Sequence, residues 1–334
     1  MAKEYNALDL DRVLEILSKP APTCILFHVH PDADAVGSAF ALAAFLRTMG
    51  SRCYCLCADE MPERLAFLVK DFPQTSVLPE SLPAEFENAR FITVDTASPQ
   101  QLGRLYELYG DRISLMIDHH EKGEPYADNL IRPGAAACGE IIFDLIAASR
   151  RNTSKHCAAL LYAAISSDTG GFRFSNVSAG TFLRAAALVE TGQVDVAALS
   201  HQLFEVKTKE ILCAERLAFD NLHLYEEGRI GISAISLAEK QANGLTDEHL
   251  TTAVDVVRSV EGVEIAVALR QPDTSGKFRV SMRANVDFDV SAVCATFGGG
   301  GHVRAAGATV TAPNVAAAES KVLAALLEAR GQAK

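Results

Sequence analysis

Carboxylate and imidazole side chains recur in short segments of the N-terminal part of the chain, where they could bind divalent metal ions. The set comprises His28, Asp32, Asp34, Asp95, His119 and Asp168. Oxygen and nitrogen ligands without a thiolate favour Mn²⁺ or a similar ion over a structural zinc. The set holds too many carboxylates for one ion, so we expect two ions that share a bridging carboxylate. Two-metal sites stabilise the attacking and the leaving oxygen in phosphoryl hydrolysis, which is the chemistry that the set predicts.

Three apolar runs place several of these side chains at strand ends. The runs lie at 24–27, 91–94 and 113–117 and have the length and composition of buried strands. They lead into His28, Asp95 and Asp118, and ligands of open α/β sheets bind outside the carboxyl ends of strands. A single Asp in a small-residue turn is also ordinary capping chemistry, but capping does not explain acids or histidines at the same end of three strands. Asp168 follows a predicted helix, which it could simply terminate.

The pattern around these runs predicts a parallel sheet. We expect helices over 10–17 and 38–49 and a strand over 52–57, so that strand, helix and strand form a βαβ unit. Further helices are expected over 134–146, over 155–165, and in a broken stretch from 179 to 219.

The remainder of the chain predicts a second, smaller domain of mixed α/β structure. Short strands are expected at 228–232, 263–269 and 278–282, with helices at 245–257 and 315–327. The fold class is therefore α/β, with a parallel-sheet N-terminal domain, a smaller mixed C-terminal domain and a cleft between them. We expect a catalytic metal-binding domain over 1–195, a helical linker over 196–221 and a substrate-binding domain over 222–334.

Composition narrows the classes of partner. The chain has 334 residues, with 31 Lys and Arg against 42 Asp and Glu, and a formal charge of −11. This balance argues against a basic surface that binds long duplex DNA, while a local site for a small anion remains open. No run approaches about eighteen uninterrupted apolar residues, and the polar start lacks the apolar core of a signal peptide. We therefore expect a cytoplasmic protein without a membrane partner.

Cysteine usage fits a reducing compartment. The eight cysteines are spread along the chain without dense pairing. Cys53, Cys55 and Cys57 would share one face of a predicted strand. We interpret them as small buried hydrophobic residues, with a metal or redox role as the alternative.

A glycine-rich segment in the C-terminal part could bind an anion. It contains Gly299, Gly300, Gly301 and His302. Glycines are tolerated where backbone approaches a ligand, and free N–H groups beside a histidine and an arginine suit phosphate. A flexible hinge between the domains is the alternative interpretation.

Arginine and lysine residues could contribute to the same task. Lys277, Arg279 and Arg283 alternate with apolar residues, which puts positive charge on one face of a predicted strand. In the N-terminal part, Arg104 opens a short predicted helix and could reach a phosphate. An ordinary surface arginine is the alternative for Arg104.

The motifs together resemble the DHH phosphoesterase family, in the branch with a DHH-associated C-terminal domain. They lie, in order, at 28–38, 94–96, 118–120, 167–170 and 299–302. The first reads His-x-x-Pro-Asp-x-Asp-x-x-Gly-Ser, and the third reads Asp-His-His. The resemblance covers nearly the whole chain and is strongest to the bacterial nanoRNase/pAp phosphatases and the stand-alone cyclic-di-AMP phosphodiesterases. It implies two bound divalent ions, most commonly Mn²⁺.

The resemblance also implies a role for each matching residue. His28 and Asp32 would bind one ion, and the other would be bound by Asp34, His119 and Asp168. Asp95 would bridge the two ions.

The remaining implied roles concern the substrate. His120 would face the scissile phosphate, and Asp118 would orient an imidazole from behind. In the C-terminal domain, Arg283 and the loop of 299–302 would hold the distal phosphate or nucleotide.

The implied function is a Mn²⁺-dependent phosphoesterase that converts very short oligonucleotides to mononucleotides and pAp to AMP. Its partners would be short oligonucleotides, dinucleotides or pAp, and a homodimer is compatible with the sequence. A cyclic-di-AMP or linear-dinucleotide phosphodiesterase is the main alternative. A nucleotide-sensing module without turnover is a more remote one. Two other enzymatic functions are weaker alternatives. A RecJ-type exonuclease would need a basic track, which this sequence lacks. A family II pyrophosphatase would not have the glycine-rich loop that this sequence contains.

Overall fold

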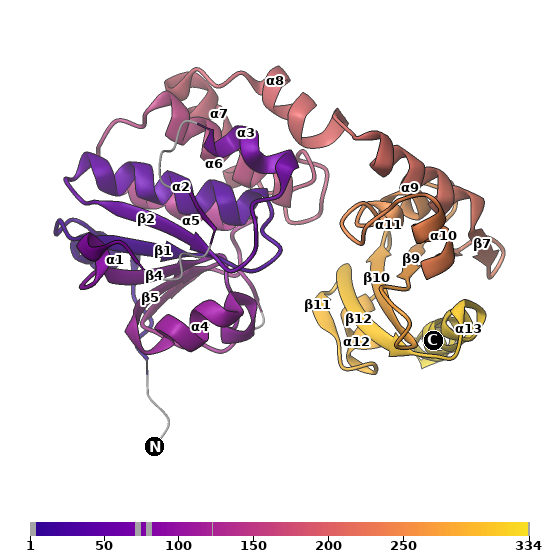
Figure 1. The fold of residues 1–334 in the computed structure, drawn as a ribbon. Helices are drawn as coiled ribbons and strands as arrows, with labels where there is room; N and C mark the ends of the chain where they lie inside the picture. The colour runs from indigo at the N-terminus through magenta and orange to yellow at the C-terminus, as the bar shows by residue number, and fades with distance from the viewer. Residues whose placement is uncertain (1–4, 71–74, 78–81, 122, 333–334) are drawn as a thin grey trace. The chain divides into compact units, whose positions relative to one another are not determined.

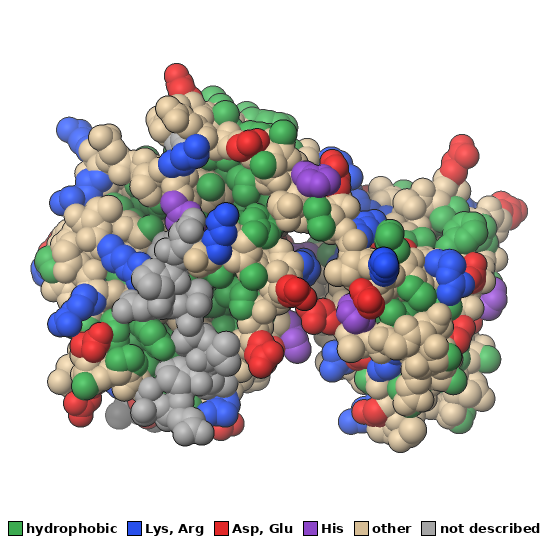
Figure 2. Space-filling view, turned by 45° about the horizontal axis from the view of Figure 1, so that its top comes forward, with side chains coloured by type: hydrophobic (Ala, Val, Ile, Leu, Met, Phe, Trp, Pro, Cys, Tyr) green, Lys and Arg blue, Asp and Glu red, His purple; other side chains and the backbone are tan. Residues whose placement is uncertain are grey.

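The computed structural model describes residues 5–70, 75–77, 82–121 and 123–332, and the chain divides into two compact units. The first unit is Met1–Val206 and the second is Lys207–Lys334, so the division falls inside the segment expected as a linker. Each unit has its own six-stranded sheet (Figure 1). On the face drawn in Figure 2, acidic and basic side chains are interspersed, as the mixed composition suggests.

The sheet of the first unit has the strand order β3-β2-β1-β4-β5-β6. Its strands are β1 (Thr23–Leu26), β2 (Cys53–Cys57), β3 (Thr75–Val77), β4 (Arg90–Val94), β5 (Ile113–Asp118) and β6 (Asn129–Ile131). All neighbouring pairs are parallel, as the βαβ pattern predicts. From β1 the chain continues outward through β2 to β3, and from β4 it continues in the opposite direction through β5 to β6. The topological switch point, where ligands bind in such sheets, therefore lies between β1 and β4.

Helices pack on this sheet through alternate strand residues. The helices are α1 (Leu10–Leu17), α2 (Ala33–Thr48), α3 (Ala66–Val69), α4 (Arg104–Tyr109), α5 (Cys138–Ala148), α6 (Lys155–Asp168), α7 (Ala179–Gly192) and α8 (Val196–Ser200), with a π-helical turn at His201–Glu205. Ile25 enters a core shared with α2, α5 and α6, whereas Leu26 enters a second core with Phe86 and α4. Both faces of the sheet are therefore buried, which is the usual state of a parallel sheet.

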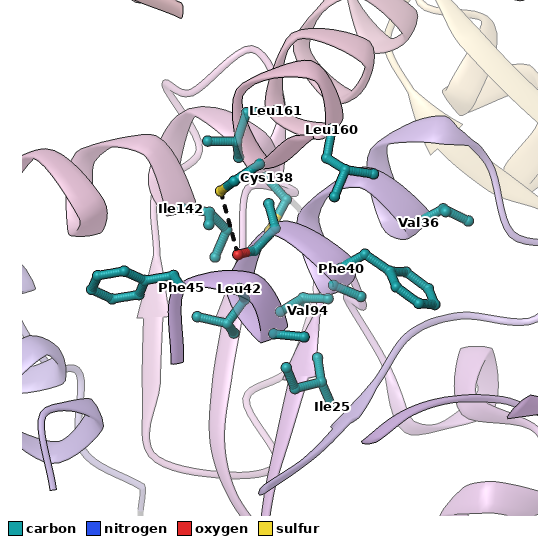
Figure 3. Close-up of a cluster of buried hydrophobic side chains, with 14 of the residues drawn as sticks. Ile25, Val36, Phe40, Leu42, Phe45, Val94, Cys138, Ile142, Leu160 and Leu161 are labelled. Atoms are coloured by element: carbon teal, nitrogen blue, oxygen red, sulfur yellow. Dashed lines mark hydrogen bonds between the residues drawn. The ribbon is translucent and has the colours of Figure 1, made fainter. Parts of the chain in front are cut away.

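Helix α2 is the buried centre of the first unit. Figure 3 shows its Phe40 and Leu42 between Ile25 and Val94 of the sheet and the side chains of α6. A Cβ atom added at Gly37 would lie 2.5 Å from the backbone oxygen of Leu160. Glycine thus permits the close approach of α2 and α6.

Among the helix boundaries that differ from the sequence prediction, three concern the candidate site. Helix α2 begins at Ala33 because Asp32 is its N-cap, with Oδ1 accepting a 3.0 Å hydrogen bond from Ala35 N. Helix α5 begins at Cys138 instead of 134, and α6 continues to Asp168 instead of ending at 165.

The second unit contains a mixed sheet in the order β11-β12-β10-β9-β8-β7. Its strands are β7 (Leu222–Tyr225), β8 (Ile230–Ile235), β9 (Ile265–Arg270), β10 (Lys277–Ala284), β11 (Gly300–His302) and β12 (Ala305–Thr311). Its helices are α9 (Lys209–Asp220), α10 (Leu237–Ala242), α11 (Ala253–Arg258), α12 (Val290–Ala295) and α13 (Val315–Gln332). Strands β8 and β9 are parallel, and the other pairs are antiparallel. Helices α12 and α13 pack on one face, and α9 and α11 pack on the other.

Two expectations for this unit are wrong in detail. The helix predicted over 245–257 reduces to α11, because the residues before it form turns. The glycine-rich segment is not simply a loop, since Gly300–His302 forms an edge strand against β12. Glycine has a low strand propensity, so local sequence carries little signal for that strand. None of the helices in the described ranges combines the length and apolar composition that crossing a bilayer requires.

Candidate metal centre

The acidic and histidine side chains of the first unit meet at the carboxyl ends of neighbouring strands. His28 follows β1, Asp95 follows β4, and His119 follows β5. The first two strands are the neighbours at the switch point of the sheet. Two helices position the other carboxylates, which belong to Asp32 and Asp34 of the α2 start and to Asp168 of the α6 end.

Asp95 occupies the middle of this cluster. Its Oδ2 lies 3.5 Å from Nε2 of His28, and its Oδ1 lies 3.4 Å from Nε2 of His119. The residue is 2% exposed, and Oδ1 is buried without a hydrogen-bond partner. Its backbone is left-handed, with φ of 54°, which is costly for a residue other than glycine. A buried carboxylate oxygen without a donor fits a cation as its partner.

His28 and Asp32 form one side of the cluster with Asp95. The Nδ1 atom of His28 lies 2.8 Å from the backbone oxygen of Val29, so the ring N–H can donate there and leave the Nε2 lone pair available. Nε2 of His28 lies 3.8 Å from Oδ1 of Asp32, and the side chain of Asp32 is 47% exposed. One ligand atom from each of the three residues lies within 4.8 Å of the others, which is a separation that one ion can span.

His119, Asp34 and Asp168 form the other side. Nε2 of His119 lies 3.4 Å from Oδ2 of Asp168 and 3.8 Å from Oδ2 of Asp34. Nδ1 of His119 lies 3.2 Å from the backbone oxygen of Ala135, which again leaves Nε2 directed at the carboxylates. The ligand atoms of these three residues also lie within 4.8 Å of one another.

Backbone amides of α5 hold Asp34 in place. Cys138 N donates to Oδ2 at 2.6 Å, Gly139 N donates to Oδ1 at 2.9 Å, and Ser38 Oγ donates to Oδ1 at 2.8 Å. Sequence reasoning missed this role of Cys138 and Gly139. The only local signal was the start of a predicted helix after small residues, because N–H groups at a helix start bind carboxylates.

His120 and Asp118 form a pair beside the cluster. Nδ1 of His120 lies 2.7 Å from Oδ1 of Asp118 and 3.9 Å from Oδ1 of Asp95. Asp118 is buried, and His120 is partly exposed. The buried Asp118 carboxylate therefore fixes the orientation of the His120 ring, so that the edge carrying Nε2 points away from Asp118.

The pKa values of several side chains in the cluster are raised, so these side chains bind protons that a metal cation would replace. Burial raises the pKa of Asp34 to about 8, and the charge of Asp95 adds to this effect. Burial also raises the pKa of Asp168 well above its usual value. Burial opposes protonation of His119, but Asp95 and the other carboxylates outweigh it and raise the pKa to about 11. Burial acts to raise the pKa of Asp95, but His119 and His28 hold it below its usual value.

The remaining site residues of the sequence analysis lie outside this cluster. Arg104 is exposed at the first position of α4. The turn before it is joined to the β1 loop by a 2.7 Å hydrogen bond from Val29 N to Gln101 O. In the second unit, Arg283 pairs across the sheet with Ala305, which pairs with His302. Arg283 and the glycine-rich strand are therefore brought together in one row, although they are far apart in sequence.

Fold and cluster together define a phosphoesterase of the DHH type. Residues 22–165 match the DHH family, N-terminal domain, and residues 232–329 match the DHHA1 domain. The chain belongs to the DHH family, whose members similar to it are hydrolases of phosphodiester bonds. This confirms the resemblance given by the motifs.

Among its relatives is the bifunctional oligoribonuclease and PAP phosphatase NrnA of Thermus thermophilus, 30% identical over 319 residues that make up 95% of this chain and 93% of the relative. The protein of the same name from Bacillus subtilis is 28% identical, with 85% and 87% of the two chains covered. The cyclic-di-AMP phosphodiesterase GdpP of Geobacillus thermodenitrificans is 26% identical over 92% of this chain but 47% of its own length. An exopolyphosphatase-related protein from Bacteroides fragilis has the same fold, with a TM-score of 0.83, 18% identity and 97% and 95% of the chains covered.

Proposed function

We propose that the protein is a Mn²⁺-dependent phosphoesterase that hydrolyses very short oligonucleotides to mononucleotides and pAp to AMP. The observation that carries the proposal is the position of Asp95, with one buried carboxylate oxygen near each of two imidazoles. The two NrnA relatives, which are similar over most of the chain, support this choice of substrates.

In this proposal, two ions share the cluster. His28 and Asp32 would hold one ion, Asp34, His119 and Asp168 would hold the other, and Asp95 would be a ligand shared by both. When bound, such ions supply an activated water and neutralise charge on the attacking and leaving oxygens. The chain itself supplies the preorganisation, because the α5 amides, Ser38 and the backbone oxygens next to the histidines fix the ligands before any ion arrives.

His120 and Asp118 serve the substrate. The short contact between Nδ1 of His120 and Oδ1 of Asp118 orients the ring that is proposed to face the scissile phosphate. Burial opposes protonation of His120, but Asp118 outweighs it and raises the pKa, so the ring can carry a proton and bind an anion. Asp118 is a positioning residue in this scheme.

Cations hold the parts of the substrate that do not react. Arg283 and the segment Gly299, Gly300, Gly301 and His302 are proposed to bind the distal phosphate or nucleotide. The row formed by Arg283, Ala305 and His302 supports this role, since the residue between the two polar ones is small. Arg104, exposed beside the turn that contacts the β1 loop, is proposed to bind a phosphate nearer the metal centre.

A cyclic-di-AMP phosphodiesterase is the second candidate. The similarity to GdpP extends over 92% of this chain and favours it. The chain corresponds to about half of that relative, whereas it corresponds to nearly all of the Thermus NrnA.

A comparison of rates on pAp, a linear dinucleotide, cyclic di-AMP and a longer RNA tests the proposal. With purified protein and Mn²⁺, we expect pAp and the dinucleotide to be hydrolysed fastest and the longer RNA slowest. A higher rate on cyclic di-AMP would select the second candidate. Binding without any turnover would favour the nucleotide-sensing alternative and overturn both enzymatic proposals.

A further inference from the structure

Cations lie along one face of β10 and extend beyond Arg283. Alternate residues of a strand point to the same side, so Lys277, Arg279 and Arg283 share the face opposite the buried Val280 and Met282. We call this surface the cationic face. The whole chain carries a formal charge of −11, yet strands β10, β11 and β12 contain no Asp or Glu. A local surplus of cations on an acidic protein concentrates anions at that surface.

Arg279 is the centre of a group of three cations. It lies directly opposite Arg270 of β9, and like charges in this arrangement repel. Oδ2 of Asp247 lies 3.7 Å from Nη1 of Arg279, and the backbone oxygen of Asp247 accepts a 3.4 Å hydrogen bond from Nη1 of Arg270. Oδ1 of Asp247 is 2.6 Å from Nζ of Lys240, which also donates to the backbone oxygen of Pro272. Arg279 and Lys240 therefore share the Asp247 carboxylate, and Arg270 contacts the backbone oxygen of the same residue.

The group is only partly satisfied by the protein. Nε of Arg270 is buried without a hydrogen-bond partner. The side chain of Arg279 is 48% exposed, so a ligand can reach its guanidinium. A phosphodiester bound here would supply a negative charge that offsets the repulsion between Arg279 and Arg270.

The surface between Arg279 and Arg283 is lined by small residues. Ser281 pairs with Gly307 across the sheet, and Gly307 pairs with Gly300. A Cβ atom added at Gly300 would meet no atom within 4 Å. Small residues let the backbone of a ligand approach the sheet closely. Ser281, Gly307 and Gly300 therefore place no large side chain on the β12 and β11 side of the line from one arginine to the other.

The spacing of the arginines sets which part of a substrate each one meets. Four residues of strand separate them, which corresponds to about 13 Å. This exceeds a single nucleotide step, so the two arginines would contact phosphates of different nucleotides. We propose that Arg279, supported by Arg270 and Lys240, forms a second anion subsite that binds an internucleotide phosphate of substrates longer than a dinucleotide. The inference rests on the proposed function, in which Arg283 holds a phosphate of the same substrate.

The test compares substrates of different length on Arg279→Gln, with Arg229→Gln as the matched control. Arg229 lies in the turn between β7 and β8, at the opposite edge of the same sheet, where it pairs with Glu226. In the 334-residue chain with Mn²⁺, we expect Arg279→Gln to raise KM for a pentanucleotide about tenfold more than KM for pAp. A plot of log affinity against log salt for the pentanucleotide should also become less steep by about 0.7. Arg229→Gln should change neither quantity.

Equilibrium binding of a fluorescent pentanucleotide separates this proposal from the proposed function. If the wild type hydrolyses no substrate but Arg279→Gln still weakens pentanucleotide binding, the proposed function fails and the subsite stands. If the wild type is active and Arg279→Gln affects pAp and the pentanucleotide equally, or leaves pentanucleotide binding unchanged, the subsite is refuted.

Discussion

In the candidate metal centre of the first unit, backbone amides hold a buried carboxylate, whereas the cationic face of the second unit presents exposed side chains at Lys277 and Arg279. Asp34 is fully buried and accepts three hydrogen bonds, two of them from α5 amides. Arg279, by contrast, is about half exposed and meets a carboxylate at 3.7 Å. Atoms that must surround small ions need fixed positions, because ion binding tolerates little displacement. Cations that attract a phosphodiester can act at longer range and adapt to the ligand.

This contrast leads to different consequences of mutation in the two regions. A change in the metal centre should alter turnover and metal binding together. A change on the cationic face should alter substrate binding and leave metal binding intact. Four experiments test the separation.

The largest effect is expected for Asp95→Asn. The substitution keeps the size of the side chain but removes the charge between the two imidazoles. We expect kcat for pAp to fall by about three orders of magnitude or more, with weaker Mn²⁺ binding in calorimetric titration. Asp111→Asn, at an exposed position before β5, is the control and should retain activity. Turnover close to wild type would refute the shared role of Asp95.

Arg283→Ala should reduce substrate binding without changing the metal centre. Loss of a charge-assisted hydrogen bond is worth about 1–3 kcal/mol, which corresponds to a rise in KM for pAp or a dinucleotide of roughly 5- to 150-fold. The Mn²⁺ affinity should equal that of the wild type. A variant that no longer binds Mn²⁺ would contradict the separation of the two regions.

The pH dependence of stability should report the protons held in the metal-free centre. The pKa of His119 is raised from 6.5 to about 11, and that of Asp34 from 3.8 to about 8. Between its unfolded and folded pKa values, each group is protonated in the folded chain and deprotonated in the unfolded chain. The free energy of unfolding therefore falls as pH rises through that range. The stabilisation from His119 is complete below pH 6.5 and lost toward 11, and the cost of ionising Asp34 grows from 3.8 toward 8.

Both contributions therefore act in the same direction between pH 6.5 and 8. In EDTA, the Tm of the first unit should fall across this window by at least the roughly 2–4 °C that 1 kcal/mol produces. Mn²⁺ should reduce the fall, because a cation replaces the protons. A Tm that rises with pH in EDTA would contradict the pKa directions.

The smallest effect is expected for Ser38→Ala. It removes one of the three hydrogen bonds to Asp34, which is worth about 1 kcal/mol, or roughly fivefold in Mn²⁺ affinity. Ser320→Ala, on the exposed side of α13, is the control. An unchanged affinity would show that the α5 amides alone position Asp34.

Sequence by itself determined the local parts of this protein. The apolar runs before His28, Asp95 and Asp118 correspond to β1, β4 and β5, because a buried strand needs a continuous apolar run that is visible in a few residues. Parallel pairing followed from the alternation of strands and helices. The motifs identified the family, and the residue types indicated metal-assisted phosphoryl chemistry.

Tertiary structure decided which of these parts meet. Asp95 lies between His28 and His119 only because β4 is inserted between β1 and β5, and strand order depends on packing between distant segments. The amides of Cys138 and Gly139 reach Asp34 across about a hundred residues of sequence, and no local pattern encodes that contact. The edge strand of Gly300–His302 and the group of Arg279, Arg270 and Asp247 likewise depend on register. Non-local pairing is fixed by the free energy of the whole core, which a reading of neighbouring residues does not contain.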